Sequence, residues 1–269
     1  ERASDVDVLA ARHLVVGDFP SHIALHPNGS HAAVLHSGWG QHEVRILDVA
    51  RWRVVSQVTI DESQYGLTWS PDGTKLYASG AATEVVHRFT FRDGYLSEHH
   101  ELRVRAAAER GVPAGLSVSD DGAALYVAEL WGQRVTKISS SDGRQLWTRV
   151  LAPPQGGSQM SHEEARVTAQ AESAAPFPFT CVSDEAHGRV YVSLWAQARV
   201  LVLDAKTGEE LNRWSVGPHP CEMMLAPDGR LFVAEANQNT VGIIDTRSGR
   251  LLERLSSALY PNAPPGSMP

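Results

Sequence analysis

The stretch "GPHPCEMMLAPDGRLFVAEANQNTVGIIDTRSGRLLERLS" (residues 217–256) contains one complete structural unit. An inner apolar segment ends at the turn "APDG" (226–229), and the short apolar segment "LFVAE" (231–235) follows it. A polar turn, the segment "VGIID" (241–245), a second polar turn and a further apolar segment complete the unit. Alternating apolar positions joined by Asp-Gly turns predict β-strands rather than helices.

The same order of turns and strands recurs along the whole chain. The turn glycines are at positions 29, 73, 122, 188 and 229, which gives steps of 44, 49, 66 and 41 residues. A repeat of about 40–45 residues with four short strands is typical of a β-propeller blade. We therefore predict an all-β propeller of four-stranded blades, with a β-sandwich as the alternative. The five expected blades span residues 17–58, 59–104, 111–151, 177–216 and 217–256.

The unit at 217–256 resembles the YVTN-type (YncE-like) β-propeller repeat. The stretches "VVGDFPSHIALHPNGS" (15–30) and "LYPNAPPGSMP" (259–269) resemble, more narrowly, the N-terminal propeller part of bacterial propeller/alkaline-phosphatase-like phosphoesterase fusion proteins. The resemblance implies seven blades in the intact ring and places metal ligands and nucleophile in a domain outside this chain. No catalytic residue is therefore transferred onto a position here.

The two ends of the chain carry further expectations about the propeller. Residues 7–20 ("DVLAARHLVVGDFP") read as an outermost strand and the loop entering the first blade, and 260–269 as the loop leading into a sixth blade. We expect residues 1–269 to form a propeller that is incomplete at its C-terminal end, with about two blades and any phosphoesterase domain beyond it. A closed five-bladed ring is the competing interpretation.

Composition limits the classes of partner. The net charge of −7 argues against general nucleic-acid binding, which depends on clustered Lys and Arg. No apolar run approaches the roughly 18 residues of a membrane-spanning helix. Because residue 1 is Glu rather than Met, the N-terminus reads as processed or excised, which leaves room for a removed signal peptide. We expect a periplasmic or secreted protein. Cys181 and Cys221 are offset by about three residues within their blades, so no disulfide between them is predicted.

Catalytic sequence motifs are missing from the chain. The sequence contains no HExxH, GxSxG, P-loop or EF-hand motif, and we expect no cofactor, no metal and no catalytic residue in this segment. The stretch "SHEEARV" (161–167) reads as a capping box. It would open a short helix through Ala171 inside an inserted loop, residues 152–176.

Aromatic and histidine side chains gather at one end of the predicted ring, which we call the top face. It comprises the loops that enter each innermost strand and the turns between second and third strands. The motif Trp-small-Gln occurs there three times, at Trp39, Trp131 and Trp195, each with a Gln two residues later. These indoles either pack against neighbouring blades or form an aromatic rim for a ligand. The predicted binding residues are His22, Tyr65, Trp131, Trp195, His219 and Asn237. Phe179 is expected at the same end of the ring.

Glu129 and Glu235 close the two "VAE" strands. Hydrogen bonding to the adjacent turn is the favoured role. Cation binding, as in metal-dependent propeller lactonases, would need six to eight converging oxygens, and the sequence shows no such set.

Three functions remain open from the sequence. The first is a non-catalytic binding or scaffolding module for a small molecule, glycan or protein on the top face. The second is a propeller enzyme of the metal-dependent lactonase or lyase type with a top-face site. The third is a structural surface or adhesion repeat protein. Fold alone does not identify the ligand.

Overall fold

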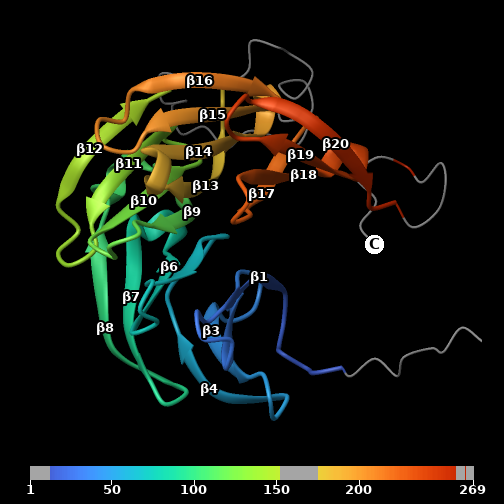
Figure 1. Cartoon of the computed structure of the whole chain (residues 1–269). Helices are drawn as coiled ribbons and strands as arrows, with labels where there is room; N and C mark the ends of the chain where they lie inside the picture. The colour runs from blue at the N-terminus through green and yellow to red at the C-terminus, as the bar shows by residue number, and fades with distance from the viewer. Residues whose placement is uncertain (1–12, 152–174, 259–263, 265–269) are drawn as a thin grey trace, which may run out of the picture.

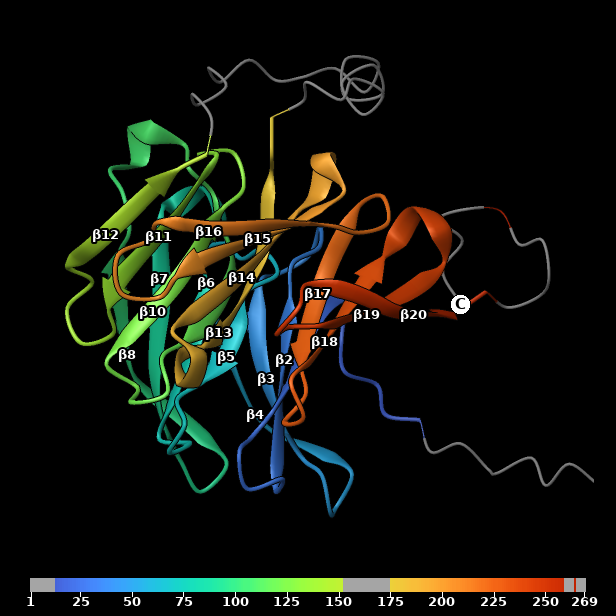
Figure 2. The ribbon, with the colours of Figure 1, turned by 45° about the horizontal axis from the view of Figure 1, so that its top comes forward.

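The computed structural model describes residues 13–151, 175–258 and 264. Five antiparallel four-stranded sheets follow one another around a common axis, from blade 1 in blue to blade 5 in red (Figures 1 and 2). Blade 1 comprises β1 (Pro20–Leu25), β2 (His31–His36), β3 (Glu43–Asp48) and β4 (Arg53–Thr59). Blade 2 comprises β5 (Leu67–Trp69), β6 (Lys75–Ser79), β7 (Val85–Arg92) and β8 (Tyr95–Arg103).

The remaining three blades have the same construction. Blade 3 comprises β9 (Pro113–Val118), β10 (Ala124–Glu129), β11 (Arg134–Ser139) and β12 (Gln145–Val150). Blade 4 comprises β13 (Pro178–Asp184), β14 (Arg189–Leu194), β15 (Arg199–Asp204) and β16 (Glu210–Ser215). Blade 5 comprises β17 (Pro220–Leu225), β18 (Arg230–Glu235), β19 (Thr240–Asp245) and β20 (Arg250–Ser256).

The predicted fold and the five predicted blades are confirmed. Every strand pairs with the strand before or after it in the sequence, and five separate sheets exclude the sandwich alternative. Helical structure in the described residues is limited to three-residue 3₁₀ turns, η1 (Ala81–Thr83), η2 (Ala107–Glu109), η3 (Glu185–His187), η4 (Trp195–Gln197) and η5 (Ala236–Gln238).

Several expectations concern residues beyond the described ranges. The helix expected at 161–171 falls within 152–174, and most of the loop at 260–269 is likewise outside. Of the outer strand expected near the N-terminus, residues 13–19 are described, and they form no strand. The described ranges contain no helix of the length and hydropathy needed to cross a membrane.

The core lies between neighbouring blades. Side chains of blades 1 and 2, including Leu35, Trp69 and Phe89, form one buried cluster, and three similar clusters join the later blades. Near the axis, backbones approach too closely for side chains. A Cβ added to Gly66 would lie 2.1 Å from the Ala114 carbonyl oxygen, and one added to Gly115 would lie 2.3 Å from the Thr180 Cα. Glycine at these positions allows the inner strands to pack against each other.

The end of the ring opposite the top face contains the Asp-Gly turns. Asp72 accepts hydrogen bonds from the Thr74 amide at 2.9 Å and from the Ser70 hydroxyl at 2.6 Å. Asp121 accepts equivalent bonds from Ala123 and Ser119. These side chains complete their own turns, which explains the recurrence of Asp before the turn glycine.

The cysteine prediction is also confirmed. Cys181 is buried and Cys221 is half-buried, and both are free thiols. Their sulfurs contact different backbone oxygens, since the Cys181 thiol donates to the Tyr126 carbonyl and the Cys221 thiol to that of His219.

Candidate functional site

The innermost strands of blades 1 and 5 bring a histidine and a carboxylate together at the top face. His22 lies on β1 and Glu222 on β17, and Nδ1 of His22 is 3.8 Å from Oε1 of Glu222. The two side chains come from blades 1 and 5 and meet near the centre of the ring, where β1 and β17 lie in Figure 1. Residues 200 positions apart are thus brought to one place by the propeller.

Burial changes the acid–base behaviour of this pair. The pKa of Glu222 is raised to about 7 because protein around the carboxyl group weakens its solvation. The side chain remains 44% accessible, which means that solvent or a ligand can still reach it. Burial lowers the pKa of His22, and a hydrogen bond to the Tyr65 backbone partly offsets this effect. Glu222 therefore exchanges its proton near neutral pH beside a neutral imidazole.

Tyr65 and Phe179 form an aromatic wall beside this pair. Their ring centroids are 4.6 Å apart at an angle of 47°. Burial raises the pKa of Tyr65, and the neighbouring Cys221 and Glu222 raise it further, so the phenol stays protonated. Burial and Glu222 also raise the pKa of the Cys221 thiol to about 11. Cys221 is thus a neutral thiol rather than a nucleophilic thiolate at neutral pH.

A second aromatic pair lies next to Cys221. The rings of Trp195 and His219 are stacked, with centroids 4.0 Å apart and planes 6° apart. Trp195 begins η4, and His219 precedes β17 with a positive φ of 53°. The end of the loop entering blade 5 therefore carries His219, and the start of β17 carries Cys221 and Glu222.

Two of the predicted binding residues have other surroundings. Trp131 is 38% exposed and packs edge-on against Phe177 at 5.5 Å. Asn237 is exposed on η5. The structure thus gathers His22, Tyr65 and Phe179 around Glu222 and pairs Trp195 with His219.

The three Trp-small-Gln copies have different roles. Gln133 is buried and accepts the Phe177 amide at 2.8 Å, whereas Gln197 accepts from Arg213 at 3.2 Å. The residue that ends the turn in a left-handed backbone conformation is Gln133 in blade 3 but Ala198 in blade 4. Relative to the turn, the Trp-small-Gln motif of blade 4 therefore begins one residue earlier than that of blade 3. Trp39 is fully exposed. The motif is therefore a turn motif whose indole packs differently in each blade.

Glu129 and Glu235 are structural hydrogen-bond acceptors, but their partners are on neighbouring strands and blade connections rather than in the adjacent turn that the sequence predicted. Glu129 is fully buried and accepts from Arg105, Arg134 and Thr136. Glu235 is also buried and accepts from the Gly217 amide, Thr240 and Arg254. Each carboxylate ties the second strand of its blade to strands and loops around it.

The central residues do not form a metal-ligand set. In residues 13–151, 175–258 and 264, one group of three His, Cys, Asp or Glu side chains has ligand atoms within 4.8 Å of one another, and it lies in blade 2. The centre offers His22 and Glu222 at 3.8 Å. This pair does not fit the oxygen-rich coordination of calcium.

A hollow also exists at the opposite end of the ring. It has a volume of about 430 Å³ and is lined by residues of blades 2 and 3, among them Asp72, Lys75, Arg88 and Asp121. Asp72 and Asp121 already hold their own turns through hydrogen bonds. The top face, where a titrating pair meets two aromatic pairs, is the stronger candidate.

Glu222 was missed by the sequence analysis, although a signal for it exists. His22 lies seven residues before Gly29, and Glu222 lies seven residues before Gly229. The same position holds Gly66 in blade 2 and Gly115 in blade 3. Comparing equivalent positions between blades, rather than searching for contiguous motifs, would have selected the two polar residues.

Comparisons with known proteins support the propeller class. The family model described as "SMP-30/Gluconolactonase/LRE-like region" matches residues 47–156. Virginiamycin B lyase from Staphylococcus aureus is similar in structure, with a TM-score of 0.66 and 15% sequence identity. That match covers 91% of this chain and 72% of the lyase chain. No curated protein sequence matches the chain.

Two further structures show how widely the fold is shared. A catalytically inactive histidine-to-alanine variant of the Staphylococcus aureus lyase, determined with quinupristin, has a TM-score of 0.64 at 14% identity, covering 91% of this chain and 72% of that one. A chain of a nidogen/laminin complex has a TM-score of 0.63 at 13% identity, covering 88% and 80%. At these identities the likeness establishes the β-propeller fold, which a lyase and a chain of a nidogen/laminin complex have in common.

Proposed function

We propose that this propeller is an enzyme of the lyase or lactonase type that opens a cyclic ester at the centre of its top face. The observation that carries the proposal is the meeting of His22 and Glu222, with Glu222 titrating near pH 7. The match to the SMP-30/gluconolactonase type and the likeness to virginiamycin B lyase support this choice among the three functions. The YncE-like resemblance and a joined phosphoesterase domain remain predictions.

The proposed chemistry uses the protein's own acid and base groups. Opening a cyclic ester requires a base to take a proton from carbon or from water, and an acid to protonate the oxygen that leaves. Glu222 is the base in its ionised form. Once it has taken the proton, Glu222 is a carboxylic acid, and it returns that proton to the oxygen that leaves. His22 is neutral and is held by its hydrogen bond to the Tyr65 backbone, 3.8 Å from Glu222, where it can position the substrate. Because the central donors do not match a calcium site, no step is assigned to a metal.

The aromatic pairs would hold the substrate. Tyr65 with Phe179 and Trp195 with His219 present ring surfaces near Cys221 and Glu222. Such surfaces bind apolar or sugar rings through contact area and stacking. A ligand-binding module without catalysis is the second candidate, because these pairs are a binding surface whether or not Glu222 transfers protons.

The pH dependence of the rate tests the proposed function. With a panel of lactones and streptogramin B-type cyclic esters, kcat/KM should rise with pH through about 7, since the base form of Glu222 is populated above its pKa. The pKa of His22 is lowered, so its protonation affects only the acid side of the profile. A pH-independent rate between pH 6 and 8 would contradict the assignment of Glu222. Binding of panel members without turnover would favour the binding module.

The contribution of Trp195 to ligand affinity can be tested against the removal of another tryptophan, Trp39. Trp195→Ala should weaken binding of a top-face ligand by about 1–4 kcal/mol, because it removes one member of the stacked pair. Trp39→Ala is the control, since Trp39 is fully exposed and its removal should change affinity by less than about 0.5 kcal/mol. Equilibrium binding and melting temperature are measured together. A lower melting temperature with unchanged affinity would show that Trp195 only packs against the loop.

A further inference from the structure

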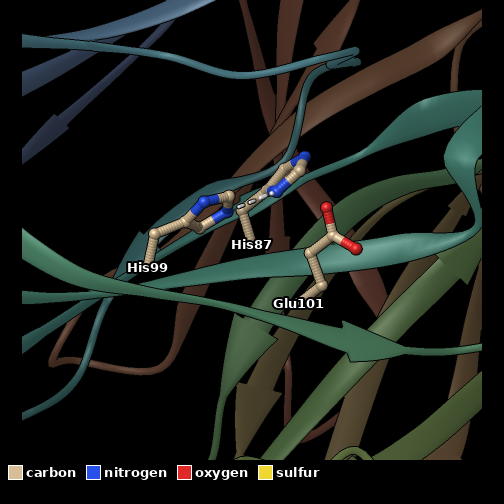
Figure 3. Close-up of side chains that lie close together, drawn as sticks. All are labelled: His87, His99 and Glu101. Carbon is tan, nitrogen blue, oxygen red and sulfur yellow. Dashed lines mark hydrogen bonds between the residues drawn. The ribbon is translucent and has the colours of Figure 1, made fainter.

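We propose that His87, His99 and Glu101 form a binding site for a divalent transition-metal ion, best matched by Zn²⁺, on the outer part of blade 2. His87 lies on β7, and His99 and Glu101 lie on β8. Figure 3 shows the three side chains on one side of this strand pair, with the two imidazole rings directed toward each other. Their ligand atoms all lie within 4.8 Å of one another.

A β-bulge brings the three residues to the same face. His87 and Glu101 are direct cross-strand partners. Beyond Arg88 the pairing shifts, so that Thr90 is opposite Ser97 and β8 contains one extra residue. Glu98, inside this bulge, has a positive φ of 49°. The bulge leaves His99 on the side of His87 and Glu101, opposite Phe89.

Both imidazole rings are oriented by their surroundings. His99 stacks on the buried Phe89 with ring centroids 4.7 Å apart and planes 13° apart. This stacking directs Nε2 of His99 to a point 2.9 Å from Nδ1 of His87. On its other side, Nε2 of His87 lies 3.3 Å from the Glu62 carbonyl oxygen. The buried His87 ring is therefore fixed by the backbone of the segment that connects blades 1 and 2, which contains Glu62.

The carbonyl contact determines which nitrogen of His87 can bind a metal. A carbonyl oxygen only accepts, so Nε2 of His87 carries the proton and Nδ1 presents its lone pair toward His99. Donation of the distal N–H to a backbone carbonyl is a common arrangement for metal-ligating histidines. To ligate as well, His99 moves its proton from Nε2 to Nδ1, which costs no net charge.

The ligand set favours zinc-like ions over calcium or magnesium. Two imidazole nitrogens and one carboxylate oxygen suit Zn²⁺ and the neighbouring late first-row ions, whereas Ca²⁺ and Mg²⁺ prefer oxygen ligands. With Zn–N bonds of about 2.0–2.1 Å, two tetrahedral ligand nitrogens are roughly 3.3 Å apart. The rings need only separate by a few tenths of an ångström. His99 and Glu101 are exposed, so they can adjust, and water can occupy the remaining coordination position.

This site is separate from the proposed active centre. His22 and Glu222 lie on innermost strands, whereas these ligands lie on the third and fourth strands of blade 2. A bound ion would fasten β8 to β7 next to the loop that contains Glu62. The proposal does not depend on the proposed function, and its test needs no substrate.

Zinc titration of the whole chain, without an affinity tag and stripped of metal, tests the proposal. Competition with a chromophoric chelator should show one tight equivalent. His99→Ala and Glu101→Gln should raise the dissociation constant at least about tenfold, because each removes a ligand. His100→Ala is the matched control: it is the neighbouring exposed histidine of β8, opposite Arg88 rather than His87. The His100→Ala variant should bind Zn²⁺ with the same affinity as the unmodified chain.

A stability readout assigns the binding to this place in a chain with 12 histidines. Saturating Zn²⁺ should raise the melting temperature of the unmodified chain and of His100→Ala, and leave that of His99→Ala unchanged. Co²⁺ in place of Zn²⁺ should give the intense visible absorption of a four-coordinate site. Equal affinity in His99→Ala and His100→Ala, or no saturable equivalent in the unmodified chain, would overturn the proposal.

Discussion

Glutamine in place of Glu222 is expected to lower kcat/KM for ring opening by about 10²–10⁴-fold, the usual contribution of a positioned general base. Glu222→Gln keeps the shape of the side chain and removes its ability to accept a proton. The variant should also lose the rise in rate through about pH 7, because that rise reports the ionisation of Glu222. Initial rates from pH 5.5 to 8.5 measure both effects.

Glu253→Gln is the control for this substitution. Glu253 is exposed on β20 of the same blade, and its replacement should leave both rate and pH profile unchanged. If Glu222→Gln retains the rate and profile of the unmodified protein, the carboxylate takes no part in the reaction. Melting temperatures of the two variants establish that a lost rate is not a lost fold.

Removal of Glu129 is expected to produce the largest loss of stability, about 3–5 kcal/mol, because it leaves buried charges without their counter-charge. Arg105 and Arg134 are 13% and 11% exposed, and each donates to the fully buried Glu129 carboxylate. In Glu129→Ala, the partners of Arg105 that remain among the described residues are the neutral Gln145, Thr136 and Thr148, whereas Arg134 retains Glu109 at 3.2 Å. Chemical denaturation measures the change in the free energy of unfolding.

Blade 5 offers a matched comparison for this prediction. Glu235 occupies the position of Glu129, but its one arginine partner, Arg254, is 39% exposed. Because Arg254 can turn toward water, Glu235→Ala should destabilise the protein less than Glu129→Ala does. If the two variants lose equal free energy of unfolding, the loss comes from the broken hydrogen bonds to the carboxylates and not from arginines left without a counter-charge.

The repeat made the fold predictable, since turn glycines and alternating strands depend on local chemistry that each blade repeats. The central pair was only half predicted. His22 was selected for its place in a loop, whereas Glu222 was overlooked because nothing next to it in the sequence suggests a site. Its raised pKa arises from burial, which only the folded ring provides.

The cluster in blade 2 could not be predicted from residue order. His99 and His100 were expected on an outer strand, and β8 contains both. Which of them faces His87 depends on the bulge at Glu98, because one extra residue reverses the face of every residue beyond it. The sequence pattern predicts which segments are strands, but it does not specify where one strand contains the extra residue of a bulge.

The pairing of each strand with its sequence neighbour has a kinetic consequence. Each blade is built from one continuous stretch, as in residues 220–256 for blade 5, and its hairpins close over short loops. Short loops cost little entropy to close, so contacts of this kind form fast. Blades can therefore form one after another as the chain leaves the ribosome, each adding to the face of the one before. The contact between His22 and Glu222 would then form only after blades 1 to 5 have assembled, and its appearance would report that these five blades are in place.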